Sequence, residues 1–121
     1  MYRTFIETNF SAAHQLHGYK GQCGRLHGHT WKIRVEVETN VIDEIGIGID
    51  FKLLKANTHS VIEKLDHEHI NEIPPFDKEN PTAENLAKYI YKNVEKTLPD
   101  QVHMVQVVVW ESEHYAVSYV E

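Results

Sequence analysis

The stretch that most constrains the fold is residues 27–39, in which apolar and charged side chains alternate from Trp31 onward. A period of two is the pattern of a β-strand, because successive side chains point to opposite faces of a sheet. One apolar and one charged face are typical of an antiparallel sheet with one solvated side. The apolar face holds Trp31, Ile33, Val35 and Val37, and the charged face holds Lys32, Arg34, Glu36 and Glu38.

Three histidines are at positions that place their side chains on the apolar faces of two predicted strands. His27 and His29 precede Trp31 at even spacing, with Gly28 between them. Residues 2–14 are also predicted to form a strand, and His14 ends its apolar face. If the two strands pair antiparallel, the end of the first lies beside the start of the second, and the three imidazoles converge. A bulge at Gly28 would break this inference.

Neutral imidazoles at this spacing predict a metal site on His14, His27 and His29. An all-nitrogen set favours Zn²⁺, and three protein ligands would leave a fourth position for water or substrate, as in catalytic zinc sites. The alternative is that the three are unrelated among the nine histidines of the chain.

Cys23 is the only cysteine and lies in a glycine-rich stretch, residues 15–26, that is predicted to be a loop. It has three interpretations: a small buried hydrophobic residue, a fourth ligand in a closed Cys-His₃ site, or a thiolate acting as a base beside the metal. Spacing alone does not choose between the closed and the catalytic site.

Two helices are expected in the middle of the chain. Asp50 is a good N-cap for a helix from residue 51 to near Leu65, with apolar residues at spacings of three and four. Thr82 is the expected N-cap of a second helix, which Pro99 ends.

Two more strands are expected after these helices, which gives the order ββααββ. Residues 102–111 are so rich in β-branched residues that we expect a strand buried on both faces, and residues 115–120 form a short last strand. This order predicts an α+β fold with a four-stranded antiparallel sheet and two helices on one face.

Two acidic features are further candidates for chemistry. Asp66 and His67 follow the first helix; they are either a solvated helix end or a carboxylate that orients a proton-carrying imidazole. Glu111 closes an apolar strand; it is either a solvated charge or an acceptor for two N–H groups of a planar, guanidine-like heterocycle.

Composition and charge exclude several classes of protein. The net charge is −6, which argues against a nucleic-acid partner. No stretch approaches the roughly 20 apolar residues of a membrane span. Residues 1–10 carry charges that do not suit a signal peptide, and one cysteine cannot form an internal disulfide. We therefore expect a cytoplasmic protein with a single domain over residues 1–121.

Taken together, the motifs resemble the 6-pyruvoyl-tetrahydropterin synthase superfamily over nearly the whole chain. The three residues between Cys23 and His27 resemble the bacterial 6-carboxy-5,6,7,8-tetrahydropterin synthase branch. The motifs are specific in combination: Phe10-Ser11-Ala12-Ala13-His14, Cys23-Gly24-Arg25-Leu26-His27-Gly28-His29, Asp50-Phe51, Leu65-Asp66-His67, Asn80-Pro81-Thr82-Ala83-Glu84-Asn85 and Trp110-Glu111.

This resemblance implies a tunnelling fold, in which trimers stack into a homohexamer around a pore, with the site at a subunit interface. It implies zinc on the three histidines and assigns roles to other residues. Cys23 would be the proton acceptor, Asp66 and His67 the relay pair, and Glu111 the anchor of the pterin ring. Thr82 and Arg25 are further substrate-binding candidates; Arg25, Lys20 and Lys52 are the cations considered for the triphosphate.

The implied reaction converts 7,8-dihydroneopterin triphosphate to 6-carboxy-5,6,7,8-tetrahydropterin, with loss of acetaldehyde and triphosphate, on the way to 7-deazaguanine and queuosine. Two alternatives remain: a 6-pyruvoyl-tetrahydropterin synthase with the same parts, and a non-catalytic zinc-binding module. His17 lies near enough in sequence to compete with His14 as a ligand, and the resemblance assigns no role to His69 or His114.

Overall fold

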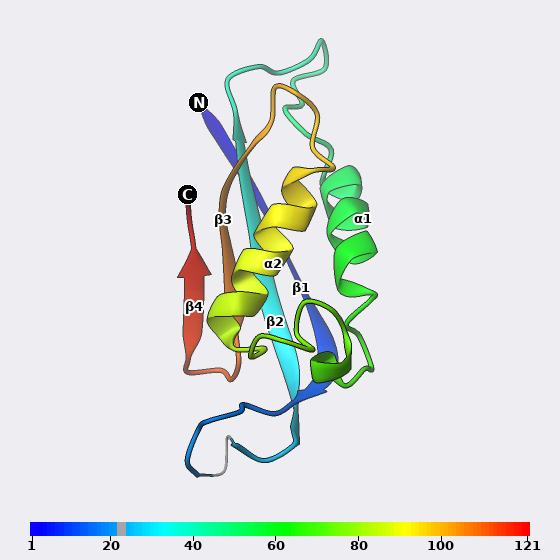
Figure 1. Ribbon diagram of the computed structural model, residues 1–121. Helices are drawn as coiled ribbons and strands as arrows, with labels where there is room; N and C mark the ends of the chain where they lie inside the picture. Colours follow the sequence, from blue (N-terminus) through cyan, green and yellow to red (C-terminus); the bar gives the residue numbers. More distant parts are fainter. Residues whose placement is uncertain (22–23) are drawn as a thin grey trace.

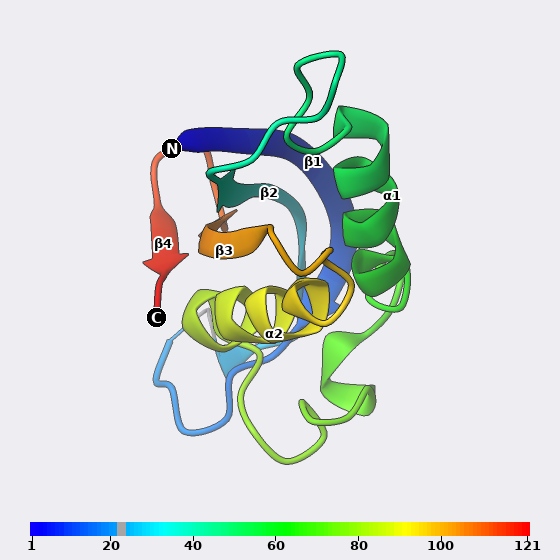
Figure 2. The ribbon, with the colours of Figure 1, turned by 90° about the horizontal axis from the view of Figure 1, so that it is seen from above.

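The structure is a computed structural model that describes residues 1–21 and 24–121 (Figure 1). One antiparallel sheet forms a layer, and two helices cover one of its faces (Figure 2). The strands follow one another in the sheet in chain order: β1 (Tyr2–His14), β2 (His27–Thr39), β3 (His103–Trp110) and β4 (Ala116–Tyr119). The predicted α+β fold with order ββααββ is confirmed.

The β1–β2 pair carries the residues predicted to bind metal. Its register runs without a shift from Tyr2 opposite Thr39 to His14 opposite His27. No bulge interrupts Gly28, so the parity argument for the histidines holds. The register of β2 against β3 does shift, between Glu36 and Val37, away from the histidines.

The helices begin where their caps predict. The Asp50 carboxylate accepts the backbone N–H of Lys52 at the start of α1 (Phe51–Ile62), and the Thr82 hydroxyl accepts that of Asn85 at the start of α2 (Ala83–Glu95). Each cap satisfies a backbone donor that the helix itself leaves unpaired. A short 3₁₀ turn, η2 (Ile70–Glu72), lies between the helices.

The core lies between the helices and the apolar face of the sheet. Fully burying one valine, leucine or isoleucine side chain in this core contributes about 1.5–3 kcal/mol. Within the described residues, neither helix combines the length and the apolar character needed to cross a bilayer. The predicted strand face of β2 is completely buried, in the same core as the apolar stripe of α2, and α2 itself lies against β3 and β4. The β2 residues of this core are Trp31, Ile33, Val35 and Val37, and those of α2 include Leu86, Ile90 and Val94.

Two expectations need correction. α1 ends at Ile62 rather than near Leu65, because the chain turns there and the N–H groups of Leu65 and Asp66 both bond to the Ile62 carbonyl. β3 is buried on one face only: Val107 and Val109 are inaccessible, whereas Val108 on the other face is half-buried. The reason is that both helices lie on the same side of the sheet.

Candidate metal centre

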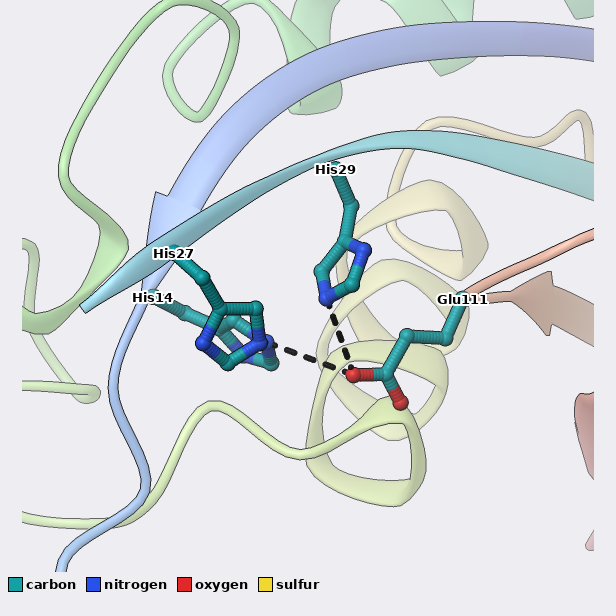
Figure 3. Close-up of side chains that lie close together, drawn as sticks. All are labelled: His14, His27, His29 and Glu111. Carbon is teal, nitrogen blue, oxygen red and sulfur yellow. Dashed lines mark hydrogen bonds and ion pairs between the residues drawn. The ribbon is translucent and has the colours of Figure 1, made fainter. Parts of the chain in front are cut away.

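Two histidines meet at the end of the sheet where β1 stops and β2 starts. His14 is opposite His27 in the register, and their Nε2 atoms lie 3.0 Å apart. The two imidazoles lie next to each other (Figure 3), and the ring centroid of His14 is 4.8 Å from that of Trp31. The His14 side chain is fully buried.

His29 and Glu111 complete the group. Glu111 Oε1 lies 3.1 Å from His29 Nε2 and 3.4 Å from His14 Nε2 (Figure 3). One candidate ligand atom from each of these residues and from His27 falls within 4.8 Å of all the others. Two ligands at 2.0–2.1 Å from one tetrahedral ion are about 3.3 Å apart, so only small side-chain adjustments separate this group from a metal site.

Backbone carbonyls fix which nitrogen of each ring faces the centre. His14 Nδ1 lies 2.8 Å from the Pro81 carbonyl oxygen, and His27 Nδ1 lies 2.6 Å from that of Arg25. A carbonyl only accepts, so each Nδ1 carries the proton and each neutral ring presents a lone pair at Nε2. Orientation of this kind by an outer hydrogen bond is usual for metal-binding histidines.

The Nε2 atoms of His14 and His27 therefore carry no proton that could form a hydrogen bond between them. The Nε2 atoms of His14 and His27 are both acceptors in the neutral rings, and Glu111 adds an anionic oxygen. His29 Nε2 is buried and makes no well-directed hydrogen bond among the described residues. Two imidazole acceptors beside an anionic oxygen suit a cation, and one candidate ligand atom from each of His14, His27, His29 and Glu111 lies close to the others, so this group fits a metal ion.

Burial favours the neutral form of the His14 and His29 rings. Loss of hydration lowers the pKa of His14, and repulsion from His27 and His29 lowers it further, against the opposing effects of Pro81 and Glu111. Burial also lowers the pKa of His29, although Glu111 opposes the shift. A neutral imidazole is the form that binds metal.

The metal-free protein should lose stability as the pH falls below about 6.5, the ordinary histidine value. Because the folded pKa values of His14 and His29 are lowered, the unfolded chain takes up protons first. Their contribution is fully present above the unfolded pKa and is lost as the pH falls through the folded one.

Thermal unfolding in EDTA between about pH 7.5 and 5 checks this expectation. The pKa values of Asp66 and Glu7 are lowered, so these carboxylates titrate below that range. A melting temperature that stayed constant or rose on acidification would contradict the sign.

Asp66 and His67 lie along the other edge of β1. Asp66 Oδ1 accepts the N–H of Ser11 and lies 3.0 Å from His67 Nδ1. The bond from Ser11 and the contact with His67 lower the pKa of the Asp66 carboxyl. The predicted contact between this carboxylate and its imidazole is therefore present, but the His67 side chain is 81% exposed and is not a member of the histidine cluster.

His67 also has an unusual backbone. Its φ is 61°, in the left-handed region, and its N–H bonds to the Ser11 carbonyl. A residue other than glycine pays for this conformation, and such residues cluster at functional sites.

The remaining candidates lie around the cluster. Cys23 is outside the described residues. Thr82 caps α2 directly after Pro81, and Arg25 contributes its carbonyl to His27 while its side chain is exposed. His17, the possible competitor of His14, is exposed and does not belong to the cluster.

Sequence reasoning missed that Glu111 approaches the histidines. The sequence did contain a signal for this position. Glu111 continues the two-residue spacing of the buried Val107 and Val109, so its side chain points to the helix side of the sheet. The orienting carbonyls of Arg25 and Pro81 have no signal in residue type, because every residue has a carbonyl.

The loop beside the centre depends on Gly24. A Cβ there would lie 2.4 Å from the Tyr19 carbonyl oxygen, and the Gly24 N–H bonds to Gly21. Gly24→Ala must therefore shift backbone atoms. We expect turnover to fall by about 10-fold or more, with a small change in melting temperature, since the core is not involved. Gly28→Ala, where a Cβ meets open space, is the control and should be much milder; equal effects would refute this account.

Comparison with known proteins relates the chain to one family of pterin enzymes. The family model described as "6-pyruvoyl tetrahydropterin synthase" matches residues 4–121. A 6-carboxy-5,6,7,8-tetrahydropterin synthase of Synechocystis sp. is 34% identical, covering 89% of this chain and 86% of its own. A dihydroneopterin monophosphate aldolase of Pyrococcus furiosus is 33% identical, covering 96% and 95%. The structure of Caenorhabditis elegans 6-pyruvoyl tetrahydropterin synthase shares the fold, with a TM-score of 0.90 at 23% identity, covering 99% of this chain and 95% of that one.

Proposed function

Because the chain belongs to the 6-pyruvoyl tetrahydropterin synthase family, we propose that it is a zinc-dependent 6-carboxy-5,6,7,8-tetrahydropterin synthase. Its substrate would be 7,8-dihydroneopterin triphosphate, and acetaldehyde and triphosphate would leave. The observation that carries the proposal is the convergence of the imidazoles of His14, His27 and His29 with the Glu111 carboxylate at one end of the sheet. Relatives named 6-carboxy-5,6,7,8-tetrahydropterin synthase, such as the Synechocystis protein, support the choice of this product.

His14, His27 and His29 are the proposed zinc ligands. Their donor set suits zinc, and fewer than four histidines leaves room for a substrate atom. When bound, the ion would supply a Lewis acid that stabilises negative charge on the oxygens of the substrate side chain.

The proton transfers are assigned to residues of the chain. We propose that the Cys23 thiolate removes a proton from a side-chain carbon of the pterin. His67 Nδ1 lies against Asp66, so a proton on this nitrogen is held there and Nε2 is free to exchange one. An imidazole oriented by a carboxylate suits the return of a proton near neutral pH.

The exposed position of His67 supports an assembly in which copies share the site. Its side chain is open to solvent and separate from the histidine cluster of its own chain. We propose a homohexamer, built as a dimer of trimers, in which His67 of one copy serves the metal centre of another.

Product analysis with 7,8-dihydroneopterin triphosphate tests the function. Release of acetaldehyde and triphosphate together with the 6-carboxy product supports the proposal. A 6-pyruvoyl product would show the related synthase instead, and a cleavage that gives a hydroxymethyl pterin would show an aldolase. Binding of zinc without any turnover would favour a non-catalytic module.

Glu111→Gln separates two roles for this residue. If Glu111 anchors the pterin, as we propose, its amide replacement keeps the shape but can accept only one of the two N–H groups and turns its own NH2 toward the other. KM should therefore rise by about 10-fold or more, from the loss of a charge-assisted pair. Zinc content should stay near one per chain. Loss of zinc from this variant, measured by elemental analysis, would instead make Glu111 a metal ligand.

A further inference from the structure

Near the metal centre, the backbone N–H and C=O groups on the outer edge of β1 form hydrogen bonds with an unusual set of partners. β2 occupies one edge of β1, and the residues at odd positions 11–17 present their backbone groups to the other. Ser11 pairs with Asp66 and His67, and the Ala13 N–H bonds to the Glu68 carbonyl at 3.0 Å. Up to this point the partner is the chain segment 66–69.

Two asparagine side chains continue the pairing beyond His14. Asn71 accepts the N–H of Gln15 through Oδ1 at 2.8 Å and donates Nδ2 to the Gln15 carbonyl at 2.8 Å. Asn80 makes the same two contacts with His17, at 2.8 and 2.9 Å. Each amide thus replaces the backbone of a neighbouring strand for one residue, because it offers one donor and one acceptor side by side.

The second amide is also tied to a metal-site contact. Asn80 precedes Pro81, whose carbonyl orients His14, and the Asn80 carbonyl itself accepts Nδ2 of Asn85 on α2 at 2.8 Å. The segment just before α2 therefore holds both the imidazole of His14, through Pro81, and the backbone of His17, through Asn80.

We propose that Asn71 and Asn80 are positioning residues, which act through the backbone of Gln15 and His17 to fix how the β1–β2 loop leaves the metal centre. Neither side chain is among the candidate ligands. The proposal rests on the proposed function for its kinetic consequences, because that loop contains the base assigned above. The geometric part, that the amides hold the start of the loop, stands independently of any reaction.

The test compares Asn71→Ala and Asn80→Ala in the purified full-length protein. We expect kcat to fall by about 10- to 100-fold, because a misplaced base costs rate. KM should rise by a smaller factor, because the same loop carries Arg25, a candidate for substrate binding. Zinc content should stay near one per chain. Asn71 should have the larger effect, since its bonds are partly buried and those of Asn80 are exposed.

Limited trypsin digestion supplies a readout that needs no turnover. The loop contains Lys20 and Arg25, both exposed, so cleavage after them reports opening of the loop. We expect cleavage at these two sites to accelerate by about tenfold or more in both variants, while other sites keep the wild-type rate. The milder Asn71→Asp keeps the acceptor and loses the donor, so its rate of loop cleavage should lie between those of the wild type and Asn71→Ala. This variant replaces Asn71→Ala in the test if the alanine variant does not fold.

Two controls separate positioning from general stability. Asn93→Ala removes a similar bond, to the Tyr89 carbonyl on α2, and should change neither kcat nor loop cleavage. His17→Ala keeps the backbone that Asn80 holds and should also be silent. Wild-type kcat and cleavage rates in both Asn71→Ala and Asn80→Ala would overturn the proposal. Faster cleavage with no turnover even in the wild-type protein would support the positioning and reject only the proposed reaction.

Discussion

Replacing His27 with alanine is expected to remove zinc and turnover together. His27 Nε2 lies 3.0 Å from His14 Nε2, and its ring is oriented by the Arg25 carbonyl. Loss of an outer partner of a metal ligand usually costs 10- to 100-fold in affinity or activity, so loss of a ligand itself should cost more than about 100-fold. Elemental analysis of the purified variant and a turnover assay at saturating substrate measure the two effects.

His17→Ala is the matched control for this prediction. His17 is also a histidine close to His14 in sequence, but it is exposed and outside the cluster. Its replacement should leave one zinc per chain and nearly wild-type turnover. Full activity of a zinc-free His27→Ala variant would refute a zinc-dependent mechanism.

Cys23→Ala is expected to abolish turnover without removing zinc. A positioned general base contributes about 10²- to 10⁴-fold to a rate, so kcat should fall within that range. KM should change little, because the pterin contacts proposed for Glu111 do not involve the thiol. The three histidines remain, so elemental analysis should still find about one zinc per chain.

Cys23→Ser refines the same experiment. A hydroxyl is a far weaker base than a thiolate near neutral pH, so the serine variant should be nearly as inactive as the alanine variant. Loss of zinc with the thiol in both variants would show a closed Cys-His₃ site and favour the non-catalytic module.

The sheet and the convergence of the three histidines were predictable from the sequence because a strand has a fixed period. The parity of His27 and His29 relative to Trp31 placed them on the apolar face, and the antiparallel pairing brought His14 opposite His27. Both helix starts were predictable for a related reason, since Asp50 and Thr82 each satisfy a backbone donor locally. These features depend on residues close together in the sequence or in one ladder.

The rest depends on contacts between distant segments. The edge pairing of Ser11 with Asp66 and His67 joins residues 55 and 56 positions apart, and no periodicity announces it. The bonds of Asn71 and Asn80 to backbone atoms are of the same kind, because an asparagine in a loop has many possible partners. β3 looked buried on both faces because β-branched residues suit a strand whether or not a layer covers it.

The ladder from Tyr2–Thr39 to His14–His27 gives a bound ion a mechanical consequence. An ion held by His14 and His27 would cross-link the two residues that flank the loop of residues 15–26. The single cysteine of the chain cannot provide such a cross-link through an internal disulfide. Glu111, which follows β3, would fasten a third strand if it joined them. Since such a cross-link exists only in the folded chain, each tenfold excess of free metal over its dissociation constant adds about 1.4 kcal/mol of stability.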